Sequence, residues 1–474
     1  MTMENCRNLI IGSGEAGKYL AWNLGKQGQQ VVLVERSMIG GSCPNIACLP
    51  SKNVIYSAKV ASLVGRAAEF GIETRPVHID MARVLRRKQE MVDGLIQLHV
   101  DKFKESGAEL VMGEARFTAA KTVEVTLVGG GTRVMQGERI FLNVGSRAAR
   151  PDVPGLAEAE PMTHIELLNI ARLPEHLVIL GGGYVGLEFA QAMRRFGSRV
   201  TLIHRGKQLL NREDPDVAQV LYQLLKDDGI DVLLETELRS VEGRSGDQVN
   251  LRVQSGSVTY LLKASDILIA VGRTPNTDRL GAEKVGIALD AYGTIVVNDR
   301  LETTAPDVWA MGDCAGTPHF THAAFDDFRV VRDNLAGGRR STRDRLIPYC
   351  LFTDPELAHV GLNETRAQAA NIPYRLARMP MAAILRTRTV SEPRGFLKAL
   401  VGEDDRILGC TVFGVEANEI VATVHAAMLG NVPYTTLGNA IFTHPTVSEG
   451  LTMLFGTLPD HPTPSGAGAK ENNR

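Results

Sequence analysis

Cysteine is scarce in this 474-residue sequence, which contains six. So few cysteines cannot form the dense disulfide framework of a small secreted domain, and in a reducing compartment a close pair is more often catalytic or metal-binding. The net charge is −2 and the lysines and arginines are scattered, so the sequence has no electrostatic footprint for nucleic acid. These absences favour an enzyme that acts on small molecules, and they direct attention to Cys43 and Cys48.

Long apolar runs are also missing from the sequence. The most apolar stretch, residues 177–193, contains four glycines and Glu188, so it is not the uninterrupted run that a membrane-spanning helix needs. The chain reaches its first apolar strand, residues 9–11, without the charged and apolar regions and cleavage site of an export signal. We therefore expect a cytoplasmic protein with neither a membrane nor a nucleic acid as its partner.

Glycine is plentiful, with 47 residues, and two glycine-rich turns occur in the same context. Each turn, 12–17 and 181–186, lies between an apolar strand and an amphipathic helix that leads to a second apolar strand. That second strand closes at Glu35 in the first copy and at His204 in the second, eighteen positions after the last glycine in both. The length suggests roughly three domains, and the repeat predicts that two of them bind nucleotides.

The three glycines of each turn have separate physical functions. The first permits a tight turn, the second lets the backbone approach a pyrophosphate, and the third allows close packing of helix on strand, while the helix N-terminus faces the phosphates. A glycine-rich turn without a nucleotide is a fair alternative for one copy alone, but two copies in full context favour dinucleotide binding. The predicted nucleotide contacts are Gly12, Gly14 and Gly17 in the first turn, and Gly181, Gly183 and Gly186 in the second.

The residues that close the two strands predict different nucleotides. A carboxylate accepts hydrogen bonds from a free ribose 2′-hydroxyl but repels a 2′-phosphate, so Glu35 suits the adenosine ribose of FAD. At the second site His204 and Arg205 replace the acid and can bind a 2′-phosphate by charge-assisted hydrogen bonds. We predict NADPH as the coenzyme, with NADH possible; the alternative for Arg205 is a solvated surface charge.

Cys43 and Cys48 lie in the segment 40–52, just after the strand that ends at Glu35. Five residues of regular helix advance about 7.5 Å, whereas disulfide-bonded Cα atoms lie roughly 4.4 to 6.8 Å apart, so a bond requires a distorted turn. Pro44 cannot donate a backbone hydrogen bond, and Pro50 disfavours helix at the residue before it. The sequence therefore predicts an irregular segment with a reducible disulfide rather than two unrelated buried cysteines.

Together these motifs resemble the class I pyridine nucleotide-disulfide oxidoreductases, the family of glutathione reductase, dihydrolipoamide dehydrogenase and mercuric reductase. The resemblance covers about residues 8–456 and includes the further motifs 142–146, 271–276, 311–313 and 444–449. It implies an α/β fold with two Rossmann-like dinucleotide-binding domains, for FAD and NAD(P), plus a C-terminal α+β dimerisation domain. The expected divisions are an FAD-binding domain with the redox disulfide at 1–150, an NAD(P)H-binding domain at 151–272, a central segment completing the FAD site at 273–342, an interface domain at 343–458 and a disordered tail at 459–474.

The resemblance also implies roles for individual residues. Cys48 is then the charge-transfer thiolate against the flavin, and Cys43 is the interchange thiol that meets the substrate. Lys52 pairs with Glu188 beside the flavin N5, since its buried charge requires such a partner. His444 is the general acid/base on Cys43, with Glu449 orienting its ring. In the family this histidine comes from the opposite subunit, so we expect a homodimer with shared active sites.

Further cofactor contacts follow from the same resemblance. Asp313 is expected to bind the ribityl chain or phosphate region of FAD, and Tyr184 to gate the nicotinamide pocket; packing is the alternative for Tyr184. The remaining expected contacts are Gly41, Ser42, Lys52 and Gly145 for FAD, and Glu188 and Gly272 for NADPH. His319 and His322 could share a helix face and bind a metal, but contact with the flavin or packing is the favoured interpretation, so no metal is predicted.

The resulting prediction is an NAD(P)H-dependent flavoprotein disulfide oxidoreductase that passes hydride from NADPH to FAD and electrons to the Cys43–Cys48 disulfide. Residues 320–321, 326–333, 340–345 and 441–445 resemble the mercuric-reductase-like branch that contains the bacterial hypothiocyanous acid and cupric ion reductase. A hypothiocyanite-like oxidant or a metal ion such as Cu(II) or Hg(II) is the expected substrate. Pro44 and Ala47 depart from that pattern, and residues 461–474 lack the added cysteine pair of mercuric reductases.

Other functions stay open at this point. Glutathione-disulfide reductase is one alternative, and dihydrolipoamide dehydrogenase is another, although His204 in place of an acid argues against NAD specificity. A flavin oxidase with vestigial cysteines is a third. Outside enzymology, the sequence is compatible with a flavin-binding redox sensor without turnover.

Overall fold

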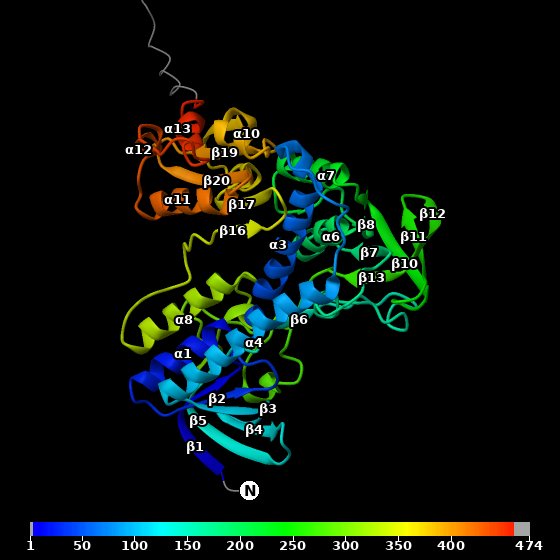
Figure 1. The fold of residues 1–474 in the computed structure, drawn as a ribbon. Coiled ribbons are helices and arrows are strands. Elements are labelled where there is room, and N and C mark those ends of the chain that lie inside the picture. The colour runs from blue at the N-terminus through cyan, green and yellow to red at the C-terminus, as the bar shows by residue number, and fades with distance from the viewer. Residues whose placement is uncertain (1–2, 459–474) are drawn as a thin grey trace, which may run out of the picture. The chain divides into compact units, whose positions relative to one another are not determined.

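The computed structural model describes residues 3–458 of the chain (Figure 1). The tail expected at 459–474 lies outside the described residues. The chain divides into two compact units. The first holds the chain up to Leu210 together with Tyr222–Arg345, and the second holds Asn211–Leu221 and the chain from Leu346 onward. The finer domain boundaries expected from the sequence stay predictions.

The first unit contains a six-stranded sheet in which five strands pair in parallel. It consists of β1 (Met3–Ile11), β2 (Val31–Glu35), β3 (Glu109–Ala119), β4 (Thr122–Leu127), β5 (Thr132–Leu142) and β15 (Val308–Ala310). β1 lies between β2 and β5, and β4 pairs antiparallel with both β3 and β5. Helices α1 (Glu15–Lys26) and α8 (Thr321–Leu335) pack side by side over one face (Figure 1).

Both faces of the sheet are buried along β2 and at the ends of β1 and β5, which explains the continuous apolar runs there. Side chains alternate along a strand. Ile10 and Leu33 therefore pack under α1 and α8, while Leu9 and Val32 join a second core cluster on the opposite face. The carboxyl ends of β1 and β2 lead into the first glycine-rich turn and the cysteine segment.

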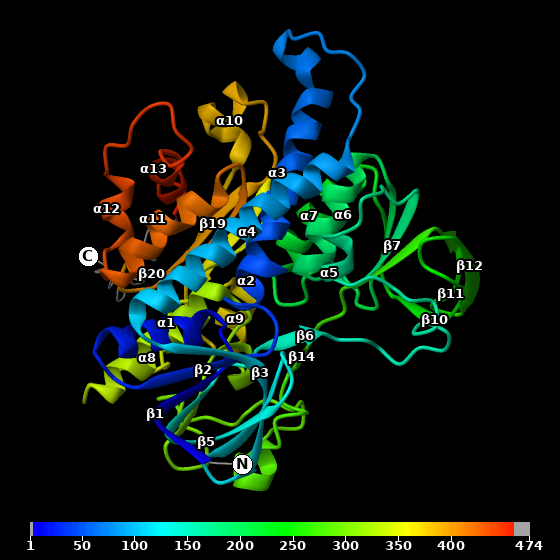
Figure 2. The same cartoon turned by 60° about the horizontal axis from the view of Figure 1, so that its bottom comes forward.

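The second nucleotide-binding domain predicted from the sequence also lies in the first unit. It contains a four-stranded parallel sheet in the order β13-β7-β8-β9. Its strands are β13 (Asp266–Ile269), β7 (His176–Leu180), β8 (Arg199–Ile203) and β9 (Asp231–Leu233), and α6 (Tyr184–Phe196) follows β7. An antiparallel sheet of β10 (Thr236–Gly243), β11 (Val249–Ser255) and β12 (Val258–Ala264) lies beside it (Figure 2). The two Rossmann-like domains are thus confirmed.

Two further connections complete the first unit. β6 (Ser146–Ala148) and β14 (Arg273–Pro275) form a short antiparallel pair between the two nucleotide-binding parts. The long helices α3 (Cys48–Gly65) and α4 (Met81–Ser106) run alongside each other, and α3 also packs against α6 (Figure 2). The short helices of this unit are α2 (Ser42–Asn45), α5 (His164–Leu167), η1 (Ala67–Phe70), η2 (Ala282–Val285) and η3 (Gly312–Ala315). Helix α7 (Pro215–Asp227) begins in the second unit and continues into the first.

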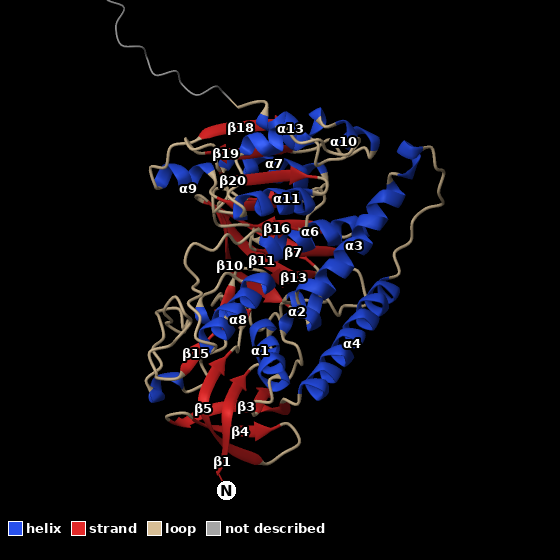
Figure 3. Cartoon of the chain, turned by 90° about the vertical axis from the view of Figure 1, so that its left-hand side faces the viewer, coloured by secondary structure: helices blue, strands red, loops and turns tan. Residues whose placement is uncertain are grey.

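The second unit is an antiparallel five-stranded sheet covered by helices, as the α+β prediction requires (Figure 3). In the order β16-β17-β20-β19-β18, the strands are β16 (Tyr349–Leu351), β17 (Glu356–Gly361), β20 (Ile407–Gly414), β19 (Phe396–Val401) and β18 (Arg375–Pro380). The helices are α9 (Glu364–Ala369), α10 (Leu385–Thr389), α11 (Ala417–Leu429), α12 (Tyr434–Gly438), α13 (Gly450–Phe455) and η4 (Met381–Ala383).

A buried lysine attaches the segment 211–221 to this sheet. Lys398 of β19 is fully buried, and its Nζ donates to Asp214 and Asp216 at 2.8 Å and to Glu364 at 2.9 Å. Burial alone lowers the pKa of Lys398, but these hydrogen bonds outweigh it and raise the pKa above its usual value. In the described part of the chain, these carboxylates are the one group at metal-ligand spacing, and the lysine already supplies their cation.

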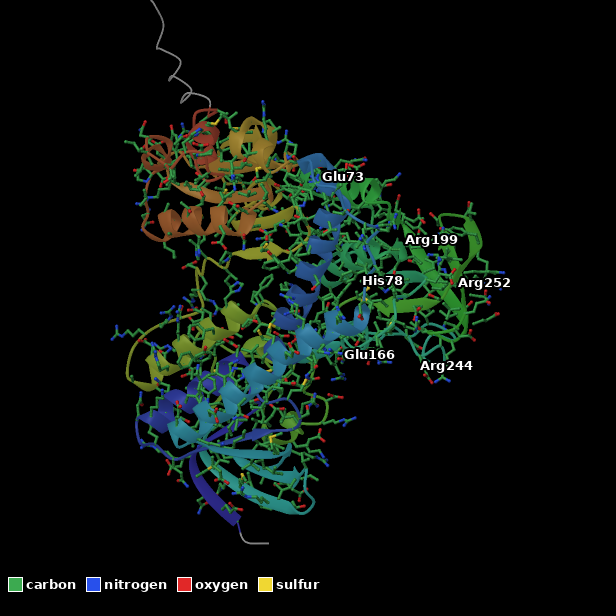
Figure 4. The ribbon with its side chains drawn as sticks, viewed as in Figure 1. Glu73, His78, Glu166, Arg199, Arg244 and Arg252 are labelled. Atoms are coloured by element: carbon green, nitrogen blue, oxygen red, sulfur yellow. The ribbon has the colours of Figure 1, made fainter. Side chains whose placement is uncertain are left out.

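Three arginines on the surface of the second Rossmann-like domain are separated from one another (Figure 4). Arg199 begins β8, Arg252 lies in β11, and Arg244 follows β10. Arg199 pairs with Asp231 at 3.3 Å and Arg244 with Glu160 at 2.5 Å. Acids thus partly neutralise this surface. Within residues 3–458, no helix combines the length and the hydropathy needed to cross a membrane.

Candidate functional site

The two cysteines flank a break between two helices. Cys43 lies in α2, and Cys48 is the first residue of α3. Between them, Ile46 and Ala47 leave the helical conformation, with φ of −140° and −130°. The distortion predicted between the cysteines is therefore present, but the expectation that Pro50 disfavours helix at Leu49 was wrong. Leu49 is helical, because Pro50 stands in the first turn of α3, where a backbone N–H is not needed for the helix.

The structure holds both cysteines as thiols, and they hydrogen-bond to each other. The hydrogen bond from Cys43, together with the Thr321 hydroxyl and the Lys52 charge, overcomes burial and lowers the pKa of Cys48 to about 6. The same hydrogen bond, with burial, raises the pKa of Cys43. Cys48 also begins an 18-residue helix, whose N-terminus favours a thiolate. The pair therefore ionises at Cys48, while Cys43 keeps its proton.

Thr321 is a thiol contact that the sequence did not single out as a site residue. It is the first residue of α8, and its Oγ1 lies 3.1 Å from Cys48 Sγ. A hydroxyl in this position donates to the thiolate, because an ionised sulfur can only accept. The neighbouring histidines had been noted, but nothing in the sequence brings residue 321 to residue 48.

Lys52 and Glu188 form the ion pair that the family resemblance implied. Lys52 lies one turn after Cys48 in α3, and its Nζ is 2.7 Å from Oε2 of Glu188 in α6. The ion pair thus links the two helices. The Glu188 side chain is 5% exposed and that of Lys52 33% exposed. The buried carboxylate thus has its cation, and the lysine places positive charge near Cys48.

In both glycine-rich turns, the residue at the end of the second strand braces the turn. Glu35 Oε2 accepts from the backbone N–H of Ser13 at 2.9 Å, and His204 Nδ1 accepts from that of Gly182 at 3.2 Å. Ser13 and Gly182 occupy the same position in the two turns. The strand ends therefore have a structural function that is separate from nucleotide recognition.

Glu35 is fully engaged within the chain. Beyond the Ser13 backbone, Oε2 accepts from the Ser13 hydroxyl at 2.7 Å, and Oε1 accepts from the N–H groups of Ser37 and Met38 at 2.9 and 3.0 Å. A carboxylate offers about four acceptor sites, so a ribose hydroxyl has to displace or share one of these donors. Contact between Glu35 and the ribose stays a prediction.

The turns themselves fit dinucleotide phosphates. Helices α1 and α6 begin directly after Gly14 and Gly183, and glycine has no side chain with which to cap their first-turn N–H groups. A Cβ at Gly183 would meet no heavy atom within 4 Å, so this turn is open to an approaching ligand. A Cβ at Gly41 would lie 2.6 Å from Gly14 Cα, so the cysteine segment, with Ser42, lies directly against the first turn.

Asp313 lies in a polar group beside the β6–β14 pair. The Ser146 hydroxyl donates to the Asp313 carboxylate, and Arg273 Nε lies 3.6 Å from it. Arg273 also donates to the Ser146 hydroxyl at 2.7 Å. Gly145 and Gly272 lie at the ends of the same pair of strands, with φ of 66° and 136°. Arg273 was not among the predicted site residues, although it lies in the motif 271–276.

Tyr184 and Phe320 meet edge to face, with ring centroids 6.1 Å apart, at the starts of α6 and α8. Phe320 also stacks on His322. His319 lies outside α8, because Phe320 at its N-cap is extended and the helix begins at Thr321. The idea that His319 and His322 share a helix face was therefore wrong.

His444 and Glu449 lie in the second unit, just before α13. His444 Nδ1 lies 2.9 Å from Glu449 Oε2, so the carboxylate orients the ring as expected. The His444 side chain is 65% exposed, whereas that of Glu449 is 20% exposed. Because Glu449 contacts Nδ1 and the imidazole is exposed, Nε2 can meet a group outside this unit.

The family described as "Pyridine nucleotide-disulphide oxidoreductase" matches residues 7–327. The dimerisation domain of the same family matches residues 347–455. This chain therefore belongs to the pyridine nucleotide-disulphide oxidoreductase family.

Individual relatives agree with this assignment. The "Probable pyridine nucleotide-disulfide oxidoreductase RclA" of Escherichia coli is 37% identical over 463 residues, which cover 96% of this chain and 100% of the relative. The "Mercuric reductase" of Acidithiobacillus ferrooxidans is 34% identical, over 95% of this chain and 82% of the relative. A solved structure of the Cu(II) complex of the HOCl-induced flavoprotein disulfide reductase RclA from E. coli matches with a TM-score of 0.87 at 36% identity, covering 96% of this chain and 99% of the other.

The chain is accordingly an FAD-dependent, NAD(P)H-dependent disulfide oxidoreductase, as the sequence predicted. It carries the dimerisation domain of the family. The roles of the individual site residues are taken up below as proposals.

Replacing Thr321 with Val should raise the pKa of Cys48, because the thiolate loses its hydroxyl donor while the volume is kept. A hydrogen bond to a charged group contributes about 1.5 kcal/mol or more, equivalent to roughly one pKa unit. The thiolate, present above pH about 6 in the parent protein, should then form only at higher pH. The pH dependence of the ultraviolet thiolate absorbance of the reduced protein measures this shift.

Thr321→Ser is the matched control, since it keeps the hydroxyl, and its titration should follow the parent curve. Equal titration curves for the Val and Ser variants would show that the hydroxyl does not stabilise the thiolate.

Proposed function

We propose that this chain is a cytoplasmic, homodimeric enzyme that uses NADPH to reduce a small oxidant through Cys43 and Cys48. The observation that carries the proposal is the pair of free thiols Cys43 and Cys48, with Thr321 Oγ1 3.1 Å from Cys48 Sγ and the pKa of Cys48 lowered to about 6. A dithiol with one ionised sulfur near neutral pH is suited to thiol-disulfide chemistry. FAD, when bound, supplies the electron transfer between the nicotinamide and the disulfide.

Cys43, Cys48 and His444 then have separate roles in reducing the substrate. Cys43 attacks an oxidised centre and forms a mixed intermediate, which the Cys48 thiolate resolves, leaving the Cys43–Cys48 disulfide. With hypothiocyanous acid, two thiols and HOSCN give the disulfide, thiocyanate, a proton and water. Because Cys43 keeps its proton in the resting pair, its attack requires a base. His444, oriented by Glu449, is the proposed base.

The proposed substrate is a hypothiocyanite-like oxidant, or a metal ion such as Cu(II) or Hg(II). In support, the names of similar proteins include an HOCl-induced flavoprotein disulfide reductase with a Cu(II) complex and a mercuric reductase. Cys43 is half-buried, which favours a small substrate. Two Cu(II) ions reduced to Cu(I) would balance the oxidation of one dithiol.

The proposed cofactor contacts are grouped around the two glycine-rich turns, one for FAD and one for NADPH. FAD contacts are Gly12, Gly14, Gly17, Glu35, Gly41, Ser42, Lys52, Gly145 and Asp313. NADPH contacts are Gly181, Gly183, Tyr184, Gly186, Glu188, His204, Arg205 and Gly272. His204 accepts from the Gly182 N–H through Nδ1, so a neutral ring carries its proton on Nε2.

The homodimer is proposed because the family's dimerisation domain covers residues 347–455. His444 lies in that domain and is exposed, as a group that acts on another subunit has to be. Each active site would then combine Cys43 and Cys48 of one subunit with His444 of the other.

The decisive experiment measures NADPH oxidation by the purified holoenzyme with hypothiocyanite, Cu(II), Hg(II), glutathione disulfide and lipoamide in parallel. We expect turnover with hypothiocyanite or a metal ion, and loss of that turnover in Cys43→Ser. The matched control is Cys350→Ser, which removes a half-buried thiol of the second unit and should keep full activity. Turnover only with glutathione disulfide or lipoamide would reassign the substrate, and retained activity in Cys43→Ser would identify a flavin oxidase.

Arg205→Ala should lower kcat/KM for NADPH by about tenfold and leave kcat/KM for NADH unchanged, because a charge-assisted hydrogen bond to the 2′-phosphate is lost. Steady-state kinetics with both coenzymes measure this. Arg199→Ala, which removes the same charge at the opposite end of β8, is the control and should change neither value. An NADH preference in the parent enzyme would contradict the assignment.

His444→Gln should slow reduction of the substrate by about a hundredfold, because the base that deprotonates Cys43 is lost. Stopped-flow reduction of the flavin by NADPH should stay near the parent rate, since that half-reaction does not need the base. Glu449→Gln should have a smaller effect, because it alters only the orientation of the ring. Unchanged turnover in His444→Gln would remove the proposed role.

A further inference from the structure

The peptide group between Met311 and Gly312 is held by a buried side chain on each side. Asn143 Nδ2 donates to the carbonyl oxygen of Met311 at 2.8 Å, and Asp327 Oδ2 accepts from the N–H of Gly312 at 2.7 Å. These two atoms belong to one peptide group, so its plane is fixed from opposite ends. The next residue along the chain is Asp313.

The backbone at this point is unusual. Gly312 has φ of 72°, and a Cβ there would lie 3.0 Å from Asn143 Nδ2. A left-handed residue directly before Asp313 sets the direction in which η3 begins. The orientation of the Asp313 side chain therefore depends on how firmly the preceding peptide is held.

Asn143 connects this peptide to the first glycine-rich turn. Its Oδ1 accepts from the backbone N–H of Gly17 at 3.0 Å, while its Nδ2 donates to Met311. One amide thus joins the end of β5 to both segments proposed to contact FAD. A Cβ at Gly14 would lie 2.5 Å from the same Oδ1, so the turn lies directly against Asn143.

Asp327 is fully buried in α8 and has a complete set of partners. Besides the Gly312 N–H, Oδ2 accepts from the Thr317 hydroxyl at 2.6 Å, and Oδ1 accepts from Arg345 Nη1 at 2.7 Å. Burial raises the pKa of Asp327, and these three donors oppose that rise. A buried carboxylate is retained only with such compensation.

We propose that Asn143 and Asp327 are positioning residues that clamp the Met311–Gly312 peptide and so aim Asp313 at FAD, with Arg345 neutralising Asp327. The inference rests on the proposed function, because it assumes that Asp313 contacts the cofactor. Neither residue needs to touch FAD. The clamp acts by removing the freedom of the peptide before the ligand binds.

The test measures the rate of FAD release from the purified holoenzyme, followed by the rise in flavin fluorescence. Asp327→Asn keeps the shape but cannot accept from both the Arg345 and Gly312 donors, so FAD should leave about tenfold faster. Asp326→Asn is the matched control. Asp326 lies on the same helix and near the same Arg345, at 3.5 Å, and its substitution should leave the release rate unchanged.

Asn143→Ala provides the second variant and keeps the test valid if Asp327→Asn does not fold. It should also accelerate FAD release. Because both side chains hold one peptide, the double variant should show less than the product of the two single accelerations. Full additivity, or equal release from Asp327→Asn and Asp326→Asn, would overturn the clamp.

Asp313→Asn distinguishes failure of the proposed contact between Asp313 and FAD from failure of the clamp alone. If its release rate matches the parent, Asp313 does not hold FAD, and both the proposed contact and the clamp fail. If it accelerates release while Asp327→Asn behaves like Asp326→Asn, the proposed contact stands and the clamp alone is overturned.

Discussion

The site depends on the Cys48 thiolate, and a largely buried thiolate needs several partners that stabilise its charge. Thr321 supplies a hydroxyl, Lys52 a positive charge, and α3 the N-terminus at which Cys48 stands. Lys52 in turn needs Glu188, which comes from the helix of the second nucleotide-binding part. The redox pair therefore depends on α3, α6 and α8, three helices that are far apart in sequence.

A second constraint is that the turns next to the proposed nucleotides must keep one conformation. Buried or half-buried polar side chains perform this function in the first unit. Glu35 and His204 hold the middle N–H of the two glycine-rich turns, and Asn143 and Asp327 hold the peptide before Asp313. Each of these side chains satisfies backbone groups that would otherwise be unpaired in the interior. Preorganised backbone of this kind can bind phosphate without rearrangement.

The second unit contributes a different kind of group. His444 is exposed and already oriented by Glu449, which suits a base that acts outside its own unit. Lys398 and its three carboxylates keep residues 211–221 on the sheet of this unit, although those residues precede it by more than a hundred positions. Within the second unit, this buried cation and the hydrogen bonds around it thus hold a segment from the middle of the sequence against the sheet.

Local patterns in the sequence were enough for the family, the two nucleotide-binding repeats and the cysteine pair, because glycine spacing and apolar runs reflect short-range geometry. They also implied the pairs Lys52–Glu188 and His444–Glu449 through the resemblance. They placed the distortion correctly between the two cysteines, but the expected loss of helix at Leu49 was wrong, since the effect of Pro50 depends on whether a helix begins just before it. Thr321, Arg273, Asn143 and Asp327 could not be assigned in advance. Their partners lie between 10 and 273 positions away, and only the packing of α8, β5 and the β6–β14 pair decides which polar atoms meet.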